Sequence, residues 1–223
     1  MKKTLTFLAA AALALAAGQA SAQAAGSYIV RLGATHIGPE VKSGDLSAPS
    51  FPGTTIDVGG NTQLVGGVTY MWTDNISIDV PLGLAFRNKI TGTGAIQGVG
   101  ELATVRALPV TLLAQYRFGE ASSRLRPYVG AGVSYAYFYR AKSTAALSGL
   151  TGGSPSNPTT MKMDGTAGPD LQVGVSYQIS EHWSVDANLI QSFLKTTGHL
   201  STGQNIDVTF NPLAAAVSVG YKF

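Results

Sequence analysis

Few side chains in this chain belong to the types that carry acid–base or nucleophilic chemistry. There are three histidines, His36, His182 and His199, and no cysteine. A nucleophilic site needs a histidine within hydrogen-bonding reach of a serine and of a carboxylate that orients its ring. His199 has Ser201 and Asp207 near it in the sequence, but a segment rich in hydroxyl residues supplies such neighbours by chance. We therefore expect no catalytic residues and no enzyme activity.

A metal or phosphate site has no better support. Without cysteine, and without two histidines at ligand spacing, the sequence contains no zinc motif. Glycine-rich stretches such as GVGELATVRA are not followed by a helix whose N-terminus would bind an anion. We expect no metal and no cofactor.

A third group of residues suggests ion pairing instead. Arg31, Asp79, Arg117, Asp186 and Lys222 carry both signs of charge and lie far apart in the chain. They can act together only if the elements of the fold bring them to one place.

The chain opens with a segment that is typical of exported proteins. Residues 1–22 begin with two lysines after the Met, continue with an apolar run and end in Ala-Ser-Ala, a small–x–small cleavage pattern. A retained anchor is the alternative, but the apolar run is too short to span a bilayer. We predict a cleaved signal peptide at 1–22 and a single domain at 23–223.

The charge of the mature chain is nearly balanced. Of 15 basic residues two lie in the leader, which leaves 13 against 12 acidic residues. No basic cluster stands out, so nothing indicates that the chain binds nucleic acid.

Alternation with a period of two recurs through the mature chain. In ISIDVPLGLAFR, residues 76–87, apolar side chains occupy one face, while small, polar or charged residues and a proline occupy the other. Each such segment has about the ten residues that a tilted strand needs to cross a bilayer. There are eight of them, at 28–35, 63–72, 76–87, 108–118, 128–139, 170–179, 183–189 and 216–223.

The connections between these segments alternate between short and long. Residues 73–75, 119–126 and 180–182 are short, whereas 37–61, 88–101, 140–165 and about 195–207 are long. Because lipid cannot pair backbone groups, strands that cross it must close into a barrel. We predict an all-β, eight-stranded antiparallel barrel in the outer membrane of a Gram-negative bacterium, with short periplasmic turns and long extracellular loops.

Aromatic residues on the lipid-facing parity gather near both ends of the predicted strands, where amphipathic rings prefer to lie. A secreted β-sandwich would explain the alternation but not these two girdles. Near the short turns they are Tyr28, Trp72, Tyr116, Phe118, Tyr177, Trp183, Tyr221 and Phe223, and near the long loops they are Phe86, Tyr137, Tyr139 and Phe193.

The last residues suggest how the chain is assembled. Tyr221 and the terminal Phe223 resemble the C-terminal signal by which outer-membrane barrels are recognised. We expect periplasmic chaperones and the barrel-assembly machinery as partners during biogenesis, and outer-membrane lipid afterwards.

Long stretches of the sequence resemble one family. TDNISIDVPLGLAFRNKI, ATVRALPVTLLAQYRFGEASSRLRPYVGAGVSY and the final GYKF resemble the OmpW family of small outer-membrane proteins. The resemblance covers nearly the whole mature chain and is weakest in 37–61 and 140–165. It implies a barrel with a narrow, largely apolar lumen that moves small, often hydrophobic, molecules. Members often have a proline immediately before the Phe of FRxKI; here that position is Ala85, and the proline is Pro81.

The residues that alternation predicts to point into the lumen fall into two zones along the barrel axis. The charged residues Arg31, Asp79, Arg117, Asp186 and Lys222 lie near the periplasmic base, where mixed signs suggest an ion-paired plug. Such a plug either blocks passage or only stabilises the barrel. Above it we expect an apolar chamber for a small hydrophobic solute, although side chains commonly fill a barrel of this size. The residues expected to bind solute are Val65, Pro81, Pro109, Leu113, Phe138, Ile190 and Leu194, with Leu113 at the boundary between the two zones.

Two of these residues suggest an exit. If the loop between strands three and four is centred near residues 94–96, Pro81 and Pro109 lie on or close to one rung. Proline cannot donate to a β-ladder, so two prolines would weaken this seam, although they are also found at bulges that shape a barrel. We therefore predict a channel or carrier for small hydrophobic solutes with lateral exit at this seam. The alternative is a structural or surface-interaction barrel without transport activity.

Overall fold

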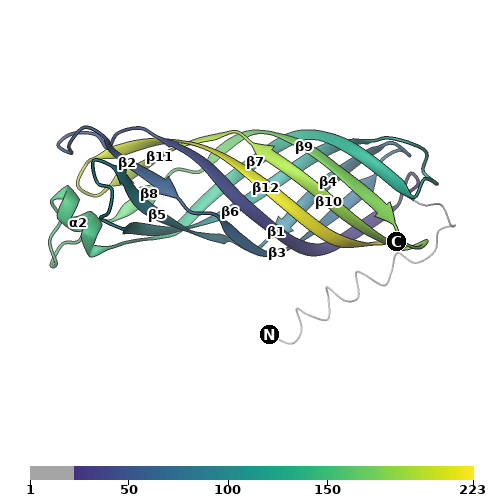
Figure 1. The fold of residues 1–223 in the computed structure, drawn as a ribbon, viewed down its shortest axis with the longest axis horizontal. Coiled ribbons are helices and arrows are strands. Elements are labelled where there is room, and N and C mark those ends of the chain that lie inside the picture. Colours follow the sequence, from purple (N-terminus) through teal and green to yellow (C-terminus); the bar gives the residue numbers. More distant parts are fainter. Residues whose placement is uncertain (1–22) are drawn as a thin grey trace, which may run out of the picture.

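The computed structural model describes residues 23–223 and consists almost entirely of β-strands (Figure 1). The predicted signal peptide, 1–22, lies outside the described residues. In chain order the elements are β1 (Tyr28–Ser43), β2 (Thr54–Val58), β3 (Asn61–Met71), β4 (Ile76–Gly83), β5 (Phe86–Gly94), β6 (Glu101–Arg117), β7 (Leu125–Ser143), α2 (Ala145–Thr151), β8 (Met161–Met163), β9 (Thr166–Gln178), β10 (Trp183–Ser192), β11 (Leu194–Leu200) and β12 (Asn205–Lys222). No helix in the described part of the chain is long and apolar enough to cross a membrane.

Among residues 23–223, eight strands form a closed antiparallel ring, as predicted. Their order is β1-β3-β4-β6-β7-β9-β10-β12, and β12 pairs back with β1 from Ile29↔Lys222 to Ser43↔Val208. Because the ring closes on itself, it has no edge strand whose backbone would be exposed to lipid.

The two ends of the barrel differ, also as predicted. Turns 72–75, 118–124 and 179–182 lie at one end, which we call the short-turn end. At the other, the long-loop end, strands continue into segments that the sequence predicted as loops: β5 lies mostly in 88–101 and β11 in 195–207. There β2 pairs with β5 and β8 pairs with β11. These extensions rise above the lipid-facing band, so their outer faces are not apolar and the alternation that marks a membrane strand is lost.

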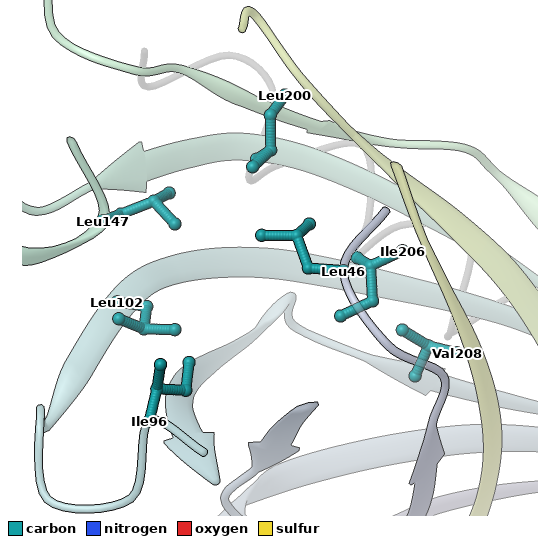
Figure 2. Packing of buried hydrophobic residues seen from close by; sticks show 7 residues of the cluster. All are labelled: Leu46, Ile96, Leu102, Leu147, Leu200, Ile206 and Val208. Carbon is teal, nitrogen blue, oxygen red and sulfur yellow. The ribbon is translucent and has the colours of Figure 1, made fainter. Parts of the chain in front are cut away.

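The long connections fold into a compact cap with an apolar centre (Figure 2). Helix α2 begins at Thr144, whose hydroxyl accepts the Leu147 amide, and ends at Gly152, whose left-handed conformation suits glycine. Side chains from α2, β6, β11, β12 and two connections then meet at the long-loop end. This cap cluster consists of Leu46, Ile96, Leu102, Leu147, Leu200, Ile206 and Val208.

The C-terminus lies at the short-turn end against the start of the barrel. The Phe223 amide donates to the Tyr28 carbonyl at 2.9 Å. The Tyr221 ring lies 4.8 Å from that of Phe223 and 4.9 Å from that of Trp183, centroid to centroid. The last residues therefore complete the closing pair of strands, while their role as an assembly signal remains a prediction.

Single cysteines can test the orientation, because the chain has none of its own. Ser156 in the cap and Ser122 in the turn between β6 and β7 are both exposed serines. We expect a membrane-impermeant maleimide to label Ser156→Cys on intact cells and Ser122→Cys only after the outer membrane is permeabilised. Labelling of Ser122→Cys on intact cells would reverse the orientation.

Candidate functional site

The lower part of the barrel interior is built around one arginine. Arg31 on β1 forms an ion pair with Asp79 on β4, and its Nη1 lies 3.3 Å from Oδ1 of Asp186 on β10. Both carboxylates accept further bonds: Thr69 donates to Asp79 at 2.7 Å, and the Tyr128 hydroxyl donates to Asp186 at 2.9 Å. All five side chains are buried. Buried charges require such partners, because desolvation would otherwise make them very costly.

Arg117 joins this cluster mainly through neutral groups. Within the described residues it makes no ion pair; its guanidinium donates to Ser77 at 3.1 Å, to Gln115 at 2.9 Å and to Gln23 at 3.2 Å. It also lies 4.8 Å from the centre of the Tyr128 ring, within the range of a cation–π contact. Four of the predicted plug residues are thus brought together, with two positive and two negative charges.

Lys222 lies lower than the other four predicted plug residues. It is buried and pairs across the ladder with Ile29 at the short-turn end, and none of the bonds described above involves it. We refer to Arg31, Asp79, Arg117 and Asp186 with their hydrogen-bonded neighbours as the base network.

Sequence reasoning missed two members of the base network. Tyr128 has inward parity but no charge, and its ring fits only because its cross-strand partner is Gly174, where a Cβ would overlap the ring. Gln23 precedes the first strand, so no alternation marks it, yet its side chain is buried and also donates to Ser176 at 3.0 Å. Only the folded barrel places either residue beside Arg117.

Above the base network lies a cavity of about 140 Å³. Of the seven predicted solute-binding residues, it is lined by Val65, Pro81, Pro109, Ile190 and Leu194. Its floor is polar, formed by Arg31 and Asp79 with Gln172 and Asn188. Among the described atoms, each of these four residues has one buried side-chain atom without a hydrogen-bond partner: Arg31 Nε, Asp79 Oδ2, Gln172 Nε2 and Asn188 Oδ1.

The other two predicted solute-binding residues, Leu113 and Phe138, do not line this cavity. Leu113 is fully buried opposite Asp79, so it lies at the height of the base network. Phe138 packs higher up against an apolar cluster that includes Ile90 and Val105. Parity along a strand gives the inward direction correctly in both cases but not the height.

Phe86 was expected in the outer aromatic girdle, and this expectation was wrong. Its side chain is 4% exposed and lines the cavity. Strand β4 ends at Gly83 and β5 begins at Phe86, so the two residues between them shift the parity by one. Phe86 therefore points inward, while Arg87, expected inside, is exposed.

The ladder beside the cavity is interrupted at this same place. Pairing of β4 with β6 stops at Asp79↔Leu113, and pairing of β5 with β6 starts at Phe86↔Ala107. Residues 80–85 and 108–112 between these rungs have no partner across this seam, although β3 and β7 pair with most of them on their other sides. We call this stretch the open seam.

Both prolines lie in the open seam, but not on one rung. The β4–β6 register, which pairs Asp79 with Leu113, would place Pro81 opposite residue 111 rather than opposite Pro109. The predicted register was off by two because the β5–β6 hairpin is centred at residue 96, as the rung Thr91↔Glu101 shows, and not at residue 95. The bulge at Ile90/Thr91 and the parity shift at 84–85 each change the alignment by one residue, in opposite directions, so the β4–β6 rungs keep that centre.

The hydrogen bonds of His199 go to residues other than Ser201 and Asp207, its neighbours in the sequence. His199 lies 2.9 Å from Asp164 and 2.6 Å from Asn205, and both partners raise its pKa, Asp164 most strongly. Ser201 instead accepts the Thr160 amide, and Asp207 accepts from Thr197.

Comparison with known proteins places this architecture among outer-membrane barrels. The sequence model of the OmpW family matches residues 24–223. The chain is 36% identical to Outer membrane protein W of Escherichia coli (strain K12), with 99% of this chain and 100% of that protein aligned. The crystal structure of OprG from Pseudomonas aeruginosa superposes with a TM-score of 0.81 at 26% identity, covering 90% of this chain and 97% of the other. A more distant relative is the Dibenzothiophene metabolism operon protein PahQ of Pseudomonas aeruginosa, 25% identical over 80% of this chain and 79% of that protein.

The two arginines of the base network should differ in their effect on stability. Arg31→Ala leaves two buried carboxylates without their cation, and we expect the free energy of unfolding to fall by about 3–5 kcal/mol. Arg117→Ala removes hydrogen bonds to neutral partners and should cost about 1–3 kcal/mol. Denaturant unfolding in lipid vesicles would measure both.

The double mutant Arg31→Ala/Asp79→Ala checks the coupling. Removing both members of the ion pair should cost clearly less than the sum of the single changes. Strict additivity would show that the two charges are not coupled.

Proposed function

This chain belongs to the OmpW family of outer-membrane proteins, and on that basis we propose that it carries small apolar solutes from the cell surface into the outer membrane. The observation that supports this best is the apolar cavity directly beside the open seam. Its wall includes Val65, Phe86 and Leu194 together with four prolines and several alanines. A small, largely apolar cavity with few polar groups is what an apolar ligand requires.

The floor of the cavity supports a carrier rather than an aqueous pore. The base network fills the interior with paired charges, and opening it would expose buried carboxylates and guanidinium groups. The unpartnered atoms of Gln172 and Asn188 would accommodate a solute with one weakly polar group at its lower end. The charged groups of the floor, Arg31 and Asp79, are already ion-paired with each other.

The path into the cavity would lead through the cap. The cap cluster consists of apolar side chains, so a hydrophobic molecule can pass between them without breaking ion pairs. Below it, a second apolar cluster around Ile90 and Val105 continues towards the cavity.

The exit would be the open seam. Elsewhere, separating two strands in lipid means breaking ladder hydrogen bonds that hydrocarbon cannot replace. Between 80–85 and 108–112 no ladder pairs join the strands, and Pro81 and Pro109 have no amide hydrogen to form one. Leu82 lines the cavity although it is also 54% exposed on the outer wall, so the cavity reaches the seam. The competing view is that the prolines and the strand break only shape the barrel.

The name of one relative supports an apolar solute. The name of PahQ connects that protein with the metabolism of dibenzothiophene, an aromatic and poorly water-soluble compound. The alternative function is a structural or surface-interaction barrel without transport. Neither of the two functions involves catalysis or a cofactor.

Filling the cavity should reduce transport. Ala214 lines it, whereas the next residue, Ala215, faces lipid, so the two positions form a matched pair on β12. We expect Ala214→Phe to slow uptake of a small alkane into proteoliposomes about tenfold or more, because the ring occupies much of the space that the solute needs. Ala215→Phe is the control, and equal flux in the two variants would favour the non-transporting barrel.

Locking the open seam should also reduce transport. Val80 and Leu112 are the first residues of the open seam beyond the last paired rung, Asp79↔Leu113, and would be opposite each other if the ladder continued. Neither side chain lines the cavity. A disulfide between Val80→Cys and Leu112→Cys should stop uptake, and reduction should restore it. The control joins Leu112→Cys to Val133→Cys across the paired β6–β7 ladder. Undiminished flux through the oxidised seam variant would end the lateral-exit proposal while leaving the cavity test unaffected.

A further inference from the structure

Five basic side chains lie on the outer wall of the barrel near the long-loop end, on three neighbouring strands. They are Arg87 and Lys89 on β5, Arg106 on β6, and Arg140 and Lys142 on β7, and all five are exposed. We call them the basic patch. The sequence did not reveal it, because the residues come from segments up to 55 positions apart.

The strand register brings these residues onto two successive rungs. One rung runs Arg87–Arg106–Tyr139, and the next runs Lys89–Thr104–Lys142. Thr104 is nearly buried between the two lysines although it is on the outer face. With strands about 4.8 Å apart and rungs about 6.7 Å apart, four of the five side chains start from an area of about 10 by 7 Å.

A bulge adds the fifth residue. On β7 two residues, Arg140 and Ala141, face the single residue Val105 on β6. Arg140 has φ 51, a left-handed conformation that is unfavourable for a residue with a side chain. The extra residue allows Ala141 to pack inside with Val105 while Arg140 remains outside. The strained backbone thus keeps a fifth cation on the outer wall.

The charges of the basic patch are poorly compensated. Arg87 and Arg106 are direct cross-strand partners, an arrangement in which like charges repel. Within residues 23–223, one of the five side chains forms an ion pair: Lys89 Nζ lies 3.4 Å from Glu101 Oε2. The acidic Asp57 is exposed on β2, whose partner β5 carries Lys89, but it forms no ion pair among the described residues. An anionic ligand would relieve this repulsion.

The surface directly below the patch is apolar. Two residues further down β6 and β7, Leu108 pairs with Tyr137, and Val110 then pairs with Tyr135. Val110, Tyr135 and Tyr137 are each about half exposed to the outside, and the Tyr137 ring stacks on that of Tyr139 at 5.8 Å. A ligand that uses both surfaces must therefore have an anionic head and an apolar tail.

The opposite wall shows that this charge is not a general feature of the rim. There Lys42, Thr209 and Lys195 form an equivalent rung across β1, β12 and β11. That rung has acidic neighbours two positions away on its own strands, Glu40 and Asp207, so the charges balance.

We propose that the basic patch binds the phosphorylated headgroup of a lipid in the outer leaflet, with the acyl chains of that lipid along the apolar wall below. Several cations on two rungs suit a head that carries more than one phosphate, and clustered Lys and Arg at a membrane surface attract anionic lipid. This inference depends on the family fold and orientation but not on transport.

Binding of lipid A with two phosphates to the purified, folded barrel in neutral detergent would test the proposal. The matched pair of variants is Lys89→Gln/Lys142→Gln on the basic patch and Lys42→Gln/Lys195→Gln on the opposite wall. We expect the first to raise the apparent Kd about tenfold and the second to change it by less than about twofold. Arg87→Gln/Arg106→Gln should weaken binding at least as much as the first pair. All these side chains are outside the barrel, and heat-modified migration on a gel would confirm that each variant is folded.

Two further arms identify the ligand. Dephosphorylated lipid A and phosphatidylcholine should bind the wild type and the variants equally weakly, and inorganic phosphate at a concentration matching the lipid should not displace lipid A. Equal losses on both walls, or binding that does not depend on the phosphates, would overturn the proposal. Displacement by inorganic phosphate would do so as well, because it would indicate a site for soluble anions.

Discussion

The pairing of backbone groups inside a medium that cannot hydrogen-bond is the constraint on which the rest of this structure depends. It forces β12 back onto β1 and makes a barrel of eight strands in the described chain. A ring of that size is narrow, so its interior is largely filled by its own side chains. The wall and the contents of the lumen therefore have one physical origin.

A narrow interior in which side chains are buried can keep charges only if they are paired and hydrogen-bonded. Arg31 meets this requirement with two carboxylates, and Arg117 meets it with amides, a hydroxyl and an aromatic ring. Polar groups are gathered at the base, which leaves the remaining volume to apolar side chains and the cavity. The separation of a closed polar floor from an apolar chamber thus follows from the cost of burying charge.

The open seam is the local exception to full pairing. Where β4 gives way to β5, the side chain of Gln63 donates to the Leu84 carbonyl, so one backbone group released by the break is satisfied without a neighbouring strand. The same break turns Phe86 into the cavity and Arg87 outward to the basic patch. One irregularity in a strand therefore shapes the cavity, the seam and the outer rim together.

The sequence by itself determined the elements that lipid imposes. Strands such as 76–83 alternate strictly because one face meets hydrocarbon, and this fixed the barrel, the inward parity of Arg31, Asp79 and Asp186, and the different lengths of the turns. Outside the lipid bilayer a strand does not need an apolar outer face, so β5, β11 and the cap could not be recognised from alternation. The tertiary structure alone decided the cross-strand register and the break at 84–85, on which the height of Leu113, the inward turn of Phe86 and the offset of the prolines depend. It also decided the place of Gln23 and the gathering of five cations on one wall. Alternation in the sequence shows which face of a strand meets lipid and which meets the barrel interior. Which residues become neighbours depends on how the strands pair.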